Sequence, residues 1–176
     1  MAENQVLSQT VYRGMTVGDA AGVEQGLGIT AKAPNGLWTA EEHVLNISRR
    51  QKAVLGGASQ NDPWIGTTQN YKVADAYRHG PSGTDTGNGI VAINLGKVPA
   101  QNQVEVWRDI DRSTITGKLA FNRSFWAQEV SVYQHIPQEA LYTPFNPLSQ
   151  ISVSQPMTYG LTIGGTGFAD NRGGSQ

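Results

Sequence analysis

The stretch Phe125-Trp-Ala-Gln-Glu-Val-Ser-Val-Tyr-Gln-His-Ile-Pro137 carries the clearest fold signal in this chain. It begins with two aromatic residues, passes Glu129, and then alternates apolar and polar side chains until it reaches a proline. Such alternation predicts a strand with one buried face, and proline is a natural end for a strand. A single carboxylate at the start of this strand is a candidate for chemistry. Taken alone, Glu129 is more simply interpreted as a solvent-facing strand residue.

The composition predicts one domain of mixed helix and strand. The chain has 176 residues, of which 38% are hydrophobic and only 15% are charged, and it contains 21 glycines. This length suits a single core, and the composition is typical of an α+β protein rich in strands and loops. The formal net charge of −1 gives no overall attraction to nucleic acid or to acidic membranes. Binding to nucleic acid would therefore need a local basic patch.

Cysteine and histidine usage narrows the possible chemistry. The chain has no cysteine, which excludes disulfides, thiolate metal sites and a cysteine nucleophile. Its three histidines show no metal-ligand spacing, so we predict no metal, and His43 is interpreted as a surface or packing residue of a helix. The first residues lack the pattern of a signal peptide, and no apolar run reaches membrane-spanning length. We expect no membrane insertion and no export signal in this chain.

The remaining elements are predicted from periodicity, capping residues and turn signals. We expect strands at 10–15, 64–68, 89–95 and 103–107. A helix is predicted from the Thr39/Glu42 capping box to residue 55, and a second over 71–78 after Asn70. Connections without regular structure are expected at 16–37, 82–89 and 108–126, followed by one helical turn at 138–142.

Three short motifs stand in a fixed order along the chain. Tyr12-Arg13-Gly14 closes the first predicted strand, Gly66-Thr67-Thr68 precedes a helix, and Gln128-Glu129-Val130-Ser131 opens a late strand that ends Ile136-Pro137. This ordered set resembles the arginine–Ser/Thr–glutamate group of ADP-ribosyltransferases, the group that holds the cholera toxin and heat-labile enterotoxin A chains. The resemblance covers residues 10–145 and implies a split β-sheet around an NAD cleft within residues 1–145. Residues 146–176 would form a glycine- and serine-rich extension, with a hairpin at 150–163 and a disordered tail from 164.

The resemblance also implies roles for individual residues, with NAD as co-substrate. Glu129 would stabilise positive charge on the ribose, Arg13 would hold the NAD phosphates, and Thr67 would hydrogen-bond to Glu129. Gly14, Thr68 and Phe121 complete the implied cofactor site. The acceptor would be presented by the segment before the strand, with the implied substrate-binding residues Phe125, Trp126, Ala127 and Gln128.

The implied function is that of a mono-ADP-ribosyltransferase toxin or effector. It would be secreted or delivered into the cytosol of a target cell, would modify a protein or RNA there, and would be neutralised by an immunity protein in its producer. Ala127 departs from the family pattern of Glu or Gln, and alanine cannot receive the acceptor's proton. A differently activated acceptor, plain NAD hydrolysis, or an inactivating replacement at this position would each account for it. A non-catalytic β-rich binding module, with Arg13 and Glu129 as an ion pair, is a separate alternative.

Overall fold

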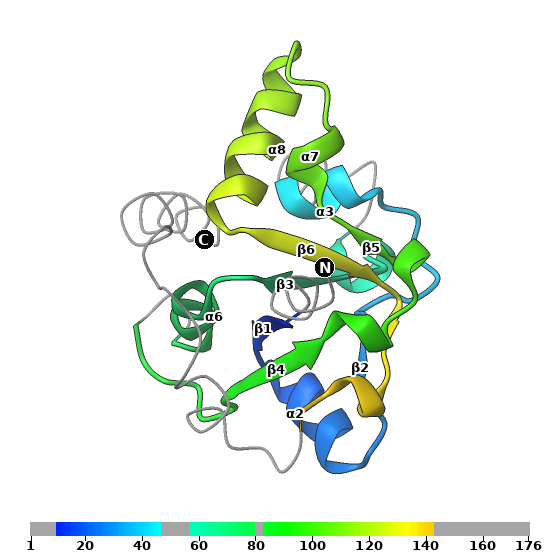
Figure 1. Cartoon of the computed structure of the whole chain (residues 1–176), viewed down its shortest axis with the longest axis vertical. Helices are drawn as coiled ribbons and strands as arrows, with labels where there is room; N and C mark the ends of the chain where they lie inside the picture. Colours follow the sequence, from blue (N-terminus) through cyan, green and yellow to red (C-terminus); the bar gives the residue numbers. More distant parts are fainter. Residues whose placement is uncertain (1–9, 47–56, 80–82, 143–176) are drawn as a thin grey trace, which may run out of the picture.

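A computed structural model describes residues 10–46, 57–79 and 83–142, and these residues form an α+β fold (Figure 1). Its larger sheet has five strands in the order β4-β1-β3-β6-β5, and a smaller sheet pairs β2 with β7; every pairing is antiparallel. The expected α+β class is thus confirmed. The strands are β1 (Thr10–Gly14), β2 (Ile29–Thr30), β3 (Trp64–Thr68), β4 (Ile90–Asn94), β5 (Gln103–Val104), β6 (Glu129–Tyr133) and β7 (His135–Ile136).

The helices fall into groups around the larger sheet. Figure 1 shows α3, α7 and α8 together at one end of the molecule, beyond β6, while α6 lies beside β1 and β3. The α-helices are α2 (Val17–Glu24), α3 (Ala40–Leu45), α5 (Ala58–Asn61), α6 (Tyr71–Arg78), α7 (Val106–Asp109) and α8 (Ile115–Trp126). Short 3-10 turns follow β4 and β7, at Leu95–Lys97, Ala100–Asn102 and Gln138–Ala140. In these described ranges no helix is both long and apolar enough to cross a bilayer.

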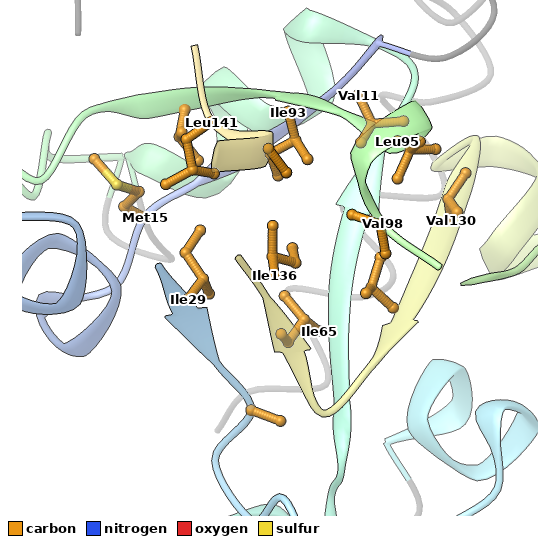
Figure 2. Packing of buried hydrophobic residues seen from close by; sticks show 14 residues of the cluster. Val11, Met15, Ile29, Ile65, Ile93, Leu95, Val98, Val130, Ile136 and Leu141 are labelled. Carbon is orange, nitrogen blue, oxygen red and sulfur yellow. The ribbon is translucent and has the colours of Figure 1, made fainter. Parts of the chain in front are cut away.

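The main core lies between the two sheets. Figure 2 shows Ile136 of the small sheet beside Ile65 of the large one, and Ile29 and Val130 belong to the same buried cluster. All four are at most 2% exposed, and full burial of each such side chain stabilises the fold by about 1.5 to 3 kcal/mol. Two smaller clusters lie against the helices, one including Tyr12, Ala74, Ile90 and Ala92 at α6, the other including Val44, Leu45, Val106 and Ala120 between α3, α7 and α8.

Several predicted elements are confirmed. The strands expected at 10–15, 64–68 and 89–95 are β1, β3 and β4, and the helix over 71–78 is α6. The Asn70 side chain caps α6 by accepting a hydrogen bond from the Lys72 amide at 3.0 Å. The helical turn expected at 138–142 is the 3-10 turn Gln138–Ala140.

The prediction of an irregular connection over 16–37 is wrong, because α2 and β2 lie in it. A capping box begins α2: the Asp19 amide donates to Thr16 Oγ1 at 3.2 Å, and Asp19 Oδ2 accepts from the Thr16 amide at 2.8 Å. An aspartate three residues after a threonine is a helix-start signal of the same kind as Thr39 and Glu42. The high glycine and alanine content concealed it.

The prediction of an irregular connection over 108–126 is also wrong. Residues in this stretch form the end of α7 and the whole of α8, whose first turn is capped by Thr114 Oγ1 accepting from the Gly117 amide at 2.9 Å. The strand expected at 103–107 is only the two residues of β5, since Val106 already belongs to α7. Phe125 and Trp126 therefore end a helix and do not open a strand. Gln128, with φ of 47°, turns the chain from α8 into β6.

The helix predicted over 39–55 is described only in part. Its capping box is confirmed, with the Glu42 amide donating to Thr39 Oγ1 at 3.2 Å. The helix α3 ends at Leu45, where Asn46 adopts the left-handed conformation that commonly ends helices. Residues 47–55 lie outside the described residues, as do the hairpin and tail expected within 146–176.

Candidate active site

Three adjacent strands bring the three sequence motifs together at the centre of the large sheet. In the observed register Tyr12 of β1 lies opposite Thr68 of β3, and Thr68 lies opposite Glu129 of β6. The motifs are separated by more than fifty residues in sequence, yet the antiparallel pairings make them neighbours. Tyr12, Thr68 and Glu129 therefore share one face of the sheet, whereas Arg13, the next residue of β1, alternates to the opposite face and contacts the second motif through the Gly66 carbonyl.

The Glu129 carboxylate is held in place by two hydrogen bonds to the same oxygen. Oε1 accepts from the Ser131 hydroxyl at 3.0 Å and lies 3.1 Å from His43 Nε2. The Glu129 side chain is 17% exposed. Within the described ranges, Oε2 has no hydrogen-bond partner and remains the oxygen that can accept from a ligand.

His43 links Glu129 to a second carboxylate. Its Nδ1 lies 2.8 Å from Asp62 Oδ2, and Asp62 Oδ1 is itself fixed by the Trp64 amide at 3.0 Å. Burial acts to lower the pKa of His43, but the hydrogen bonds and charges of Asp62 and Glu129 outweigh it and raise the pKa to about 9. At neutral pH His43 is an imidazolium that donates to both carboxylates.

This role of His43 was missed by its interpretation as a packing or surface histidine. The capping box predicted the helix that carries it, but no sequence spacing links it to Glu129, 86 residues away. Ser131 is predictable as a partner of Glu129, because residues two apart on a strand point to the same face. A serine two residues after a candidate catalytic glutamate is a signal that could have been used.

Gly66 explains why Ser131 supplies the hydroxyl. Gly66 lies opposite Ser131 in the strand pair, and a Cβ at position 66 would lie 3.3 Å from both Glu129 Oε1 and His43 Nε2. The space beside the carboxylate is thus already closely filled. The hydroxyl bonded to Glu129 Oε1 is that of Ser131, two residues along the same strand.

Thr67 does not make the hydrogen bond to Glu129 that was predicted for it. It lies opposite Val130, and its hydroxyl donates to the Val130 carbonyl at 2.6 Å. Because side chains alternate along a strand, Thr67 and Glu129 point to opposite faces of the sheet. Thr68 is on the face of Glu129, but its hydroxyl donates to the Ala127 carbonyl and so fixes the end of α8 against β3.

Arg13 ties the first motif to the second. Its Nη1 donates to the Gly66 carbonyl at 2.8 Å, and its Nε donates to Asp19 Oδ2 at 2.9 Å. The ion pair between Arg13 and Glu129 proposed for a binding module is wrong: the described partner of Arg13 is Asp19, and that of Glu129 is His43. Gly14 packs against α6, since a Cβ there would lie 2.6 Å from the Ala74 carbonyl oxygen.

The predicted substrate-binding residues lie at the C-terminal end of α8 and just beyond it. Phe121 and Phe125 are one helical turn apart and stack, with ring centroids 5.4 Å apart and planes at 12°. Phe125 is 42% exposed, Trp126 is half-buried, and Ala127 is the C-cap residue. The segment thus leads along the helix surface to Glu129.

Neither a metal centre nor a match to a known protein assigns a ligand to this site. Over the ranges the structure describes, no group of three or more histidine and acidic side chains is arranged to hold a metal ion. A cleft of about 740 Å³ runs beside β5, lined in part by Leu95, Gln103 and Arg108, but it contains neither Glu129 nor Arg13. Comparison of the chain with protein-family models and with curated proteins finds no match.

Proposed function

We propose that this chain is a mono-ADP-ribosyltransferase that moves ADP-ribose from NAD to a protein or RNA and releases nicotinamide. In this proposal the larger and smaller sheets form an ADP-ribosyltransferase-like split sheet that holds NAD. The observation that carries the proposal is the Glu129 carboxylate, fixed through one oxygen and placed beside Gly66, whose carbonyl is bound by Arg13.

The chemistry needs a fixed carboxylate of this kind. When the nicotinamide–ribose bond breaks, nicotinamide leaves with the bonding electrons and the ribose gains oxocarbenium character, as in glycoside hydrolysis. A carboxylate beside the ribose stabilises this transition state more than the ground state. His43 and Ser131 hold Oε1, so Oε2 of Glu129 is positioned before the ligand arrives. Preorganised groups of this kind are worth on the order of a hundred- to a thousand-fold in rate.

Arg13 is the candidate partner for the NAD phosphates. Its guanidinium is permanently charged and planar, which suits phosphate oxygens better than the ammonium of lysine. Two of its nitrogens are already bonded to Asp19 and Gly66, which fixes the plane of the group. The third, Nη2, makes no hydrogen bond to the part of the chain that is described, and it is the nitrogen that would face a phosphate.

Transfer completes when a nucleophilic atom of the acceptor bonds to the ribose and loses its proton. Ala127 cannot take this proton, which favours an acceptor that needs no base at this position. Water as the acceptor is the second candidate function, and the protein would then be an NAD glycohydrolase. The toxin or effector setting, with delivery into a recipient cell and a neutralising immunity protein in the producer, rests on the motif resemblance and belongs to the same proposal.

The test is incubation of the purified protein with labelled NAD and cell lysate, followed by separation of protein and RNA fractions and measurement of nicotinamide release. We expect labelling and release from the unaltered protein and a hundred- to thousand-fold slower release from Glu129→Gln. Glu24→Gln, which removes an exposed carboxylate at the end of α2, is the matched control. Ala127→Glu should increase labelling if position 127 limits transfer.

A thermal shift with NAD separates the proposal from a non-catalytic module. A ligand that binds only the folded state raises its stability by mass action, by about 2.7 kcal/mol at a hundred times its Kd. Release without labelling of any macromolecule would assign the hydrolase. The proposal fails if NAD gives neither a thermal shift nor nicotinamide release.

A further inference from the structure

The surface of α7 and α8 carries an unbroken row of aromatic rings with a guanidinium at each end. We call Arg108, Trp107, Phe125, Phe121 and Arg112 the α7–α8 ladder. The Arg108 guanidinium carbon lies 4.4 Å from the Trp107 ring centroid, and that of Arg112 lies 4.4 Å from the Phe121 centroid. Between them, Trp107 meets Phe125 edge-on at 5.7 Å, and Phe125 stacks on Phe121 at 5.4 Å.

Packing of α7 against α8 accounts for only part of this row. The edge-on contact of Trp107 with Phe125 joins the two helices, as a core contact would. Phe125 nevertheless remains 42% exposed, and Phe121 and Phe125 stack along one helix without filling an interior. Both arginines are exposed as well. Phe125 and the two arginines are therefore accessible to a partner, while Trp107 and Phe121 are partly exposed beside them.

The local charge is opposite to that of the whole chain. The chain has a net charge of −1, but α8 carries Lys118 and Arg123 and no acidic residue. Acidic groups occur nearby, since Glu105 pairs with Arg108, Asp109 is the last residue of α7, and Asp111 lies between the two helices. Arg112 and Lys118 are exposed, while Arg123 donates to the Leu45 carbonyl at 2.7 Å. The exposed cations thus flank the aromatic rings on the helix that leads to Glu129.

We propose that the α7–α8 ladder binds single-stranded nucleic acid. Unpaired bases stack on exposed aromatic rings whatever their sequence, and arginines beside the rings contact the backbone phosphates. A double helix hides its base faces, so a stacking surface selects single strands. Since α8 ends three residues before Glu129, a strand bound along it would present a nucleotide to the candidate active site. That last step rests on the proposed transferase function; the binding does not.

Binding is tested by fluorescence anisotropy of labelled single-stranded RNA and DNA of about 12 nucleotides, with a duplex of the same sequence as comparison. We expect the single strands to bind and the duplex to bind more weakly. Phe125→Ala should weaken binding about tenfold, as expected when one stacking partner is lost. The double variant Arg108→Gln/Arg112→Gln should flatten the dependence of log K on log salt by about 1.4, because each phosphate contact contributes about 0.7.

Lys72→Gln, which removes an exposed cation from α6, is the matched control and should bind as the unaltered protein does. The two exposed arginines provide a second test if Phe125→Ala alters the fold, which its thermal unfolding would show. Absence of single-strand binding overturns the inference, and so does unchanged binding by folded Phe125→Ala and by the arginine double variant.

Strand binding by the α7–α8 ladder can be tested separately from the proposed transferase function. Binding is measured without NAD and should be unchanged in Glu129→Gln. Strand binding together with neither an NAD thermal shift nor nicotinamide release would keep this inference and overturn the transferase proposal. Labelling of protein, with no binding of either single strand, would keep the transferase proposal and overturn this inference.

Discussion

His43 should make the stability of this protein fall as pH rises from about 6.5 to 9. Its pKa is raised from an ordinary value of 6.5 to about 9 by Asp62 and Glu129, against the opposing effect of burial. A group with a raised folded-state pKa binds its proton more tightly in the native state. The contribution of His43 to the free energy of unfolding is therefore complete below pH 6.5, declines as the pH rises from 6.5 to 9, and is lost above pH 9.

The size of the effect follows from the shift. At 1.36 kcal/mol per pKa unit, the change corresponds to roughly 3 kcal/mol of unfolding free energy. The His43 side chain is 16% exposed, so solvent screening removes little of this. For a domain of this length, 1 kcal/mol shifts the melting temperature by about 2 to 4 °C. The expected decline between pH 6.5 and 9 is therefore about 6 to 12 °C.

The measurement is thermal unfolding across this pH range at constant ionic strength, for the unaltered protein and His43→Gln. The variant should be the less stable protein at pH 6.5, because Asp62 and Glu129 lose their cationic partner, and its curve should be nearly flat. The two curves should converge near pH 9. His79→Gln is the control, since the His79 side chain is 31% exposed and its Nδ1 lies 2.8 Å from the Asp75 carbonyl oxygen but 3.9 Å from Asp75 Oδ1. A flat curve for the unaltered protein, or an equal decline in His43→Gln, would refute the reasoning.

Three further substitutions test other parts of the site and its support. Gly66→Ala would place a Cβ 3.3 Å from Glu129 Oε1, so nicotinamide release should slow while urea unfolding changes by less than about 1 kcal/mol. Arg13→Lys keeps the charge but replaces the two nitrogens that bond Asp19 and the Gly66 carbonyl with a single ammonium nitrogen. Urea unfolding should show that the free energy of unfolding falls by about 1 to 3 kcal/mol. Thr114→Ala removes the cap of α8 and should lower the melting temperature by about 2 to 4 °C; an unchanged value would contradict the capping role.

Local signals in the sequence were enough for much of the fold. Apolar strand segments predicted β1, β3 and β4, and the Asn70 cap predicted α6. These signals depend on residues close together in sequence, which is why they can be read without the tertiary structure. The same kind of signal was present for α2 at Thr16 and Asp19 and was overlooked. The helix α8 was harder to predict, because its apolar residues do not form a clear stripe.

The stretch from Phe125 to Pro137 shows which features of the site the sequence alone can predict and which it cannot. Its alternation predicted β6 and gave Glu129 as the first residue to test, and the ordered motifs named Arg13 as its companion. The expected strand end at Ile136-Pro137 is wrong: β6 ends at Tyr133, Gln134 has a φ of 62°, and His135–Ile136 pair with β2 in the small sheet. Which hydroxyl bonds the Glu129 carboxylate depends on strand register. Thr67 lies opposite Val130 and points to the other face of the sheet, whereas Ser131 points to the same face as Glu129. The approach of His43 depends on packing α3 against the sheet across 86 residues of sequence. The sequence determined the carboxylate and its strand; only the tertiary structure decided its partners, because register and long-range packing are properties of the folded chain.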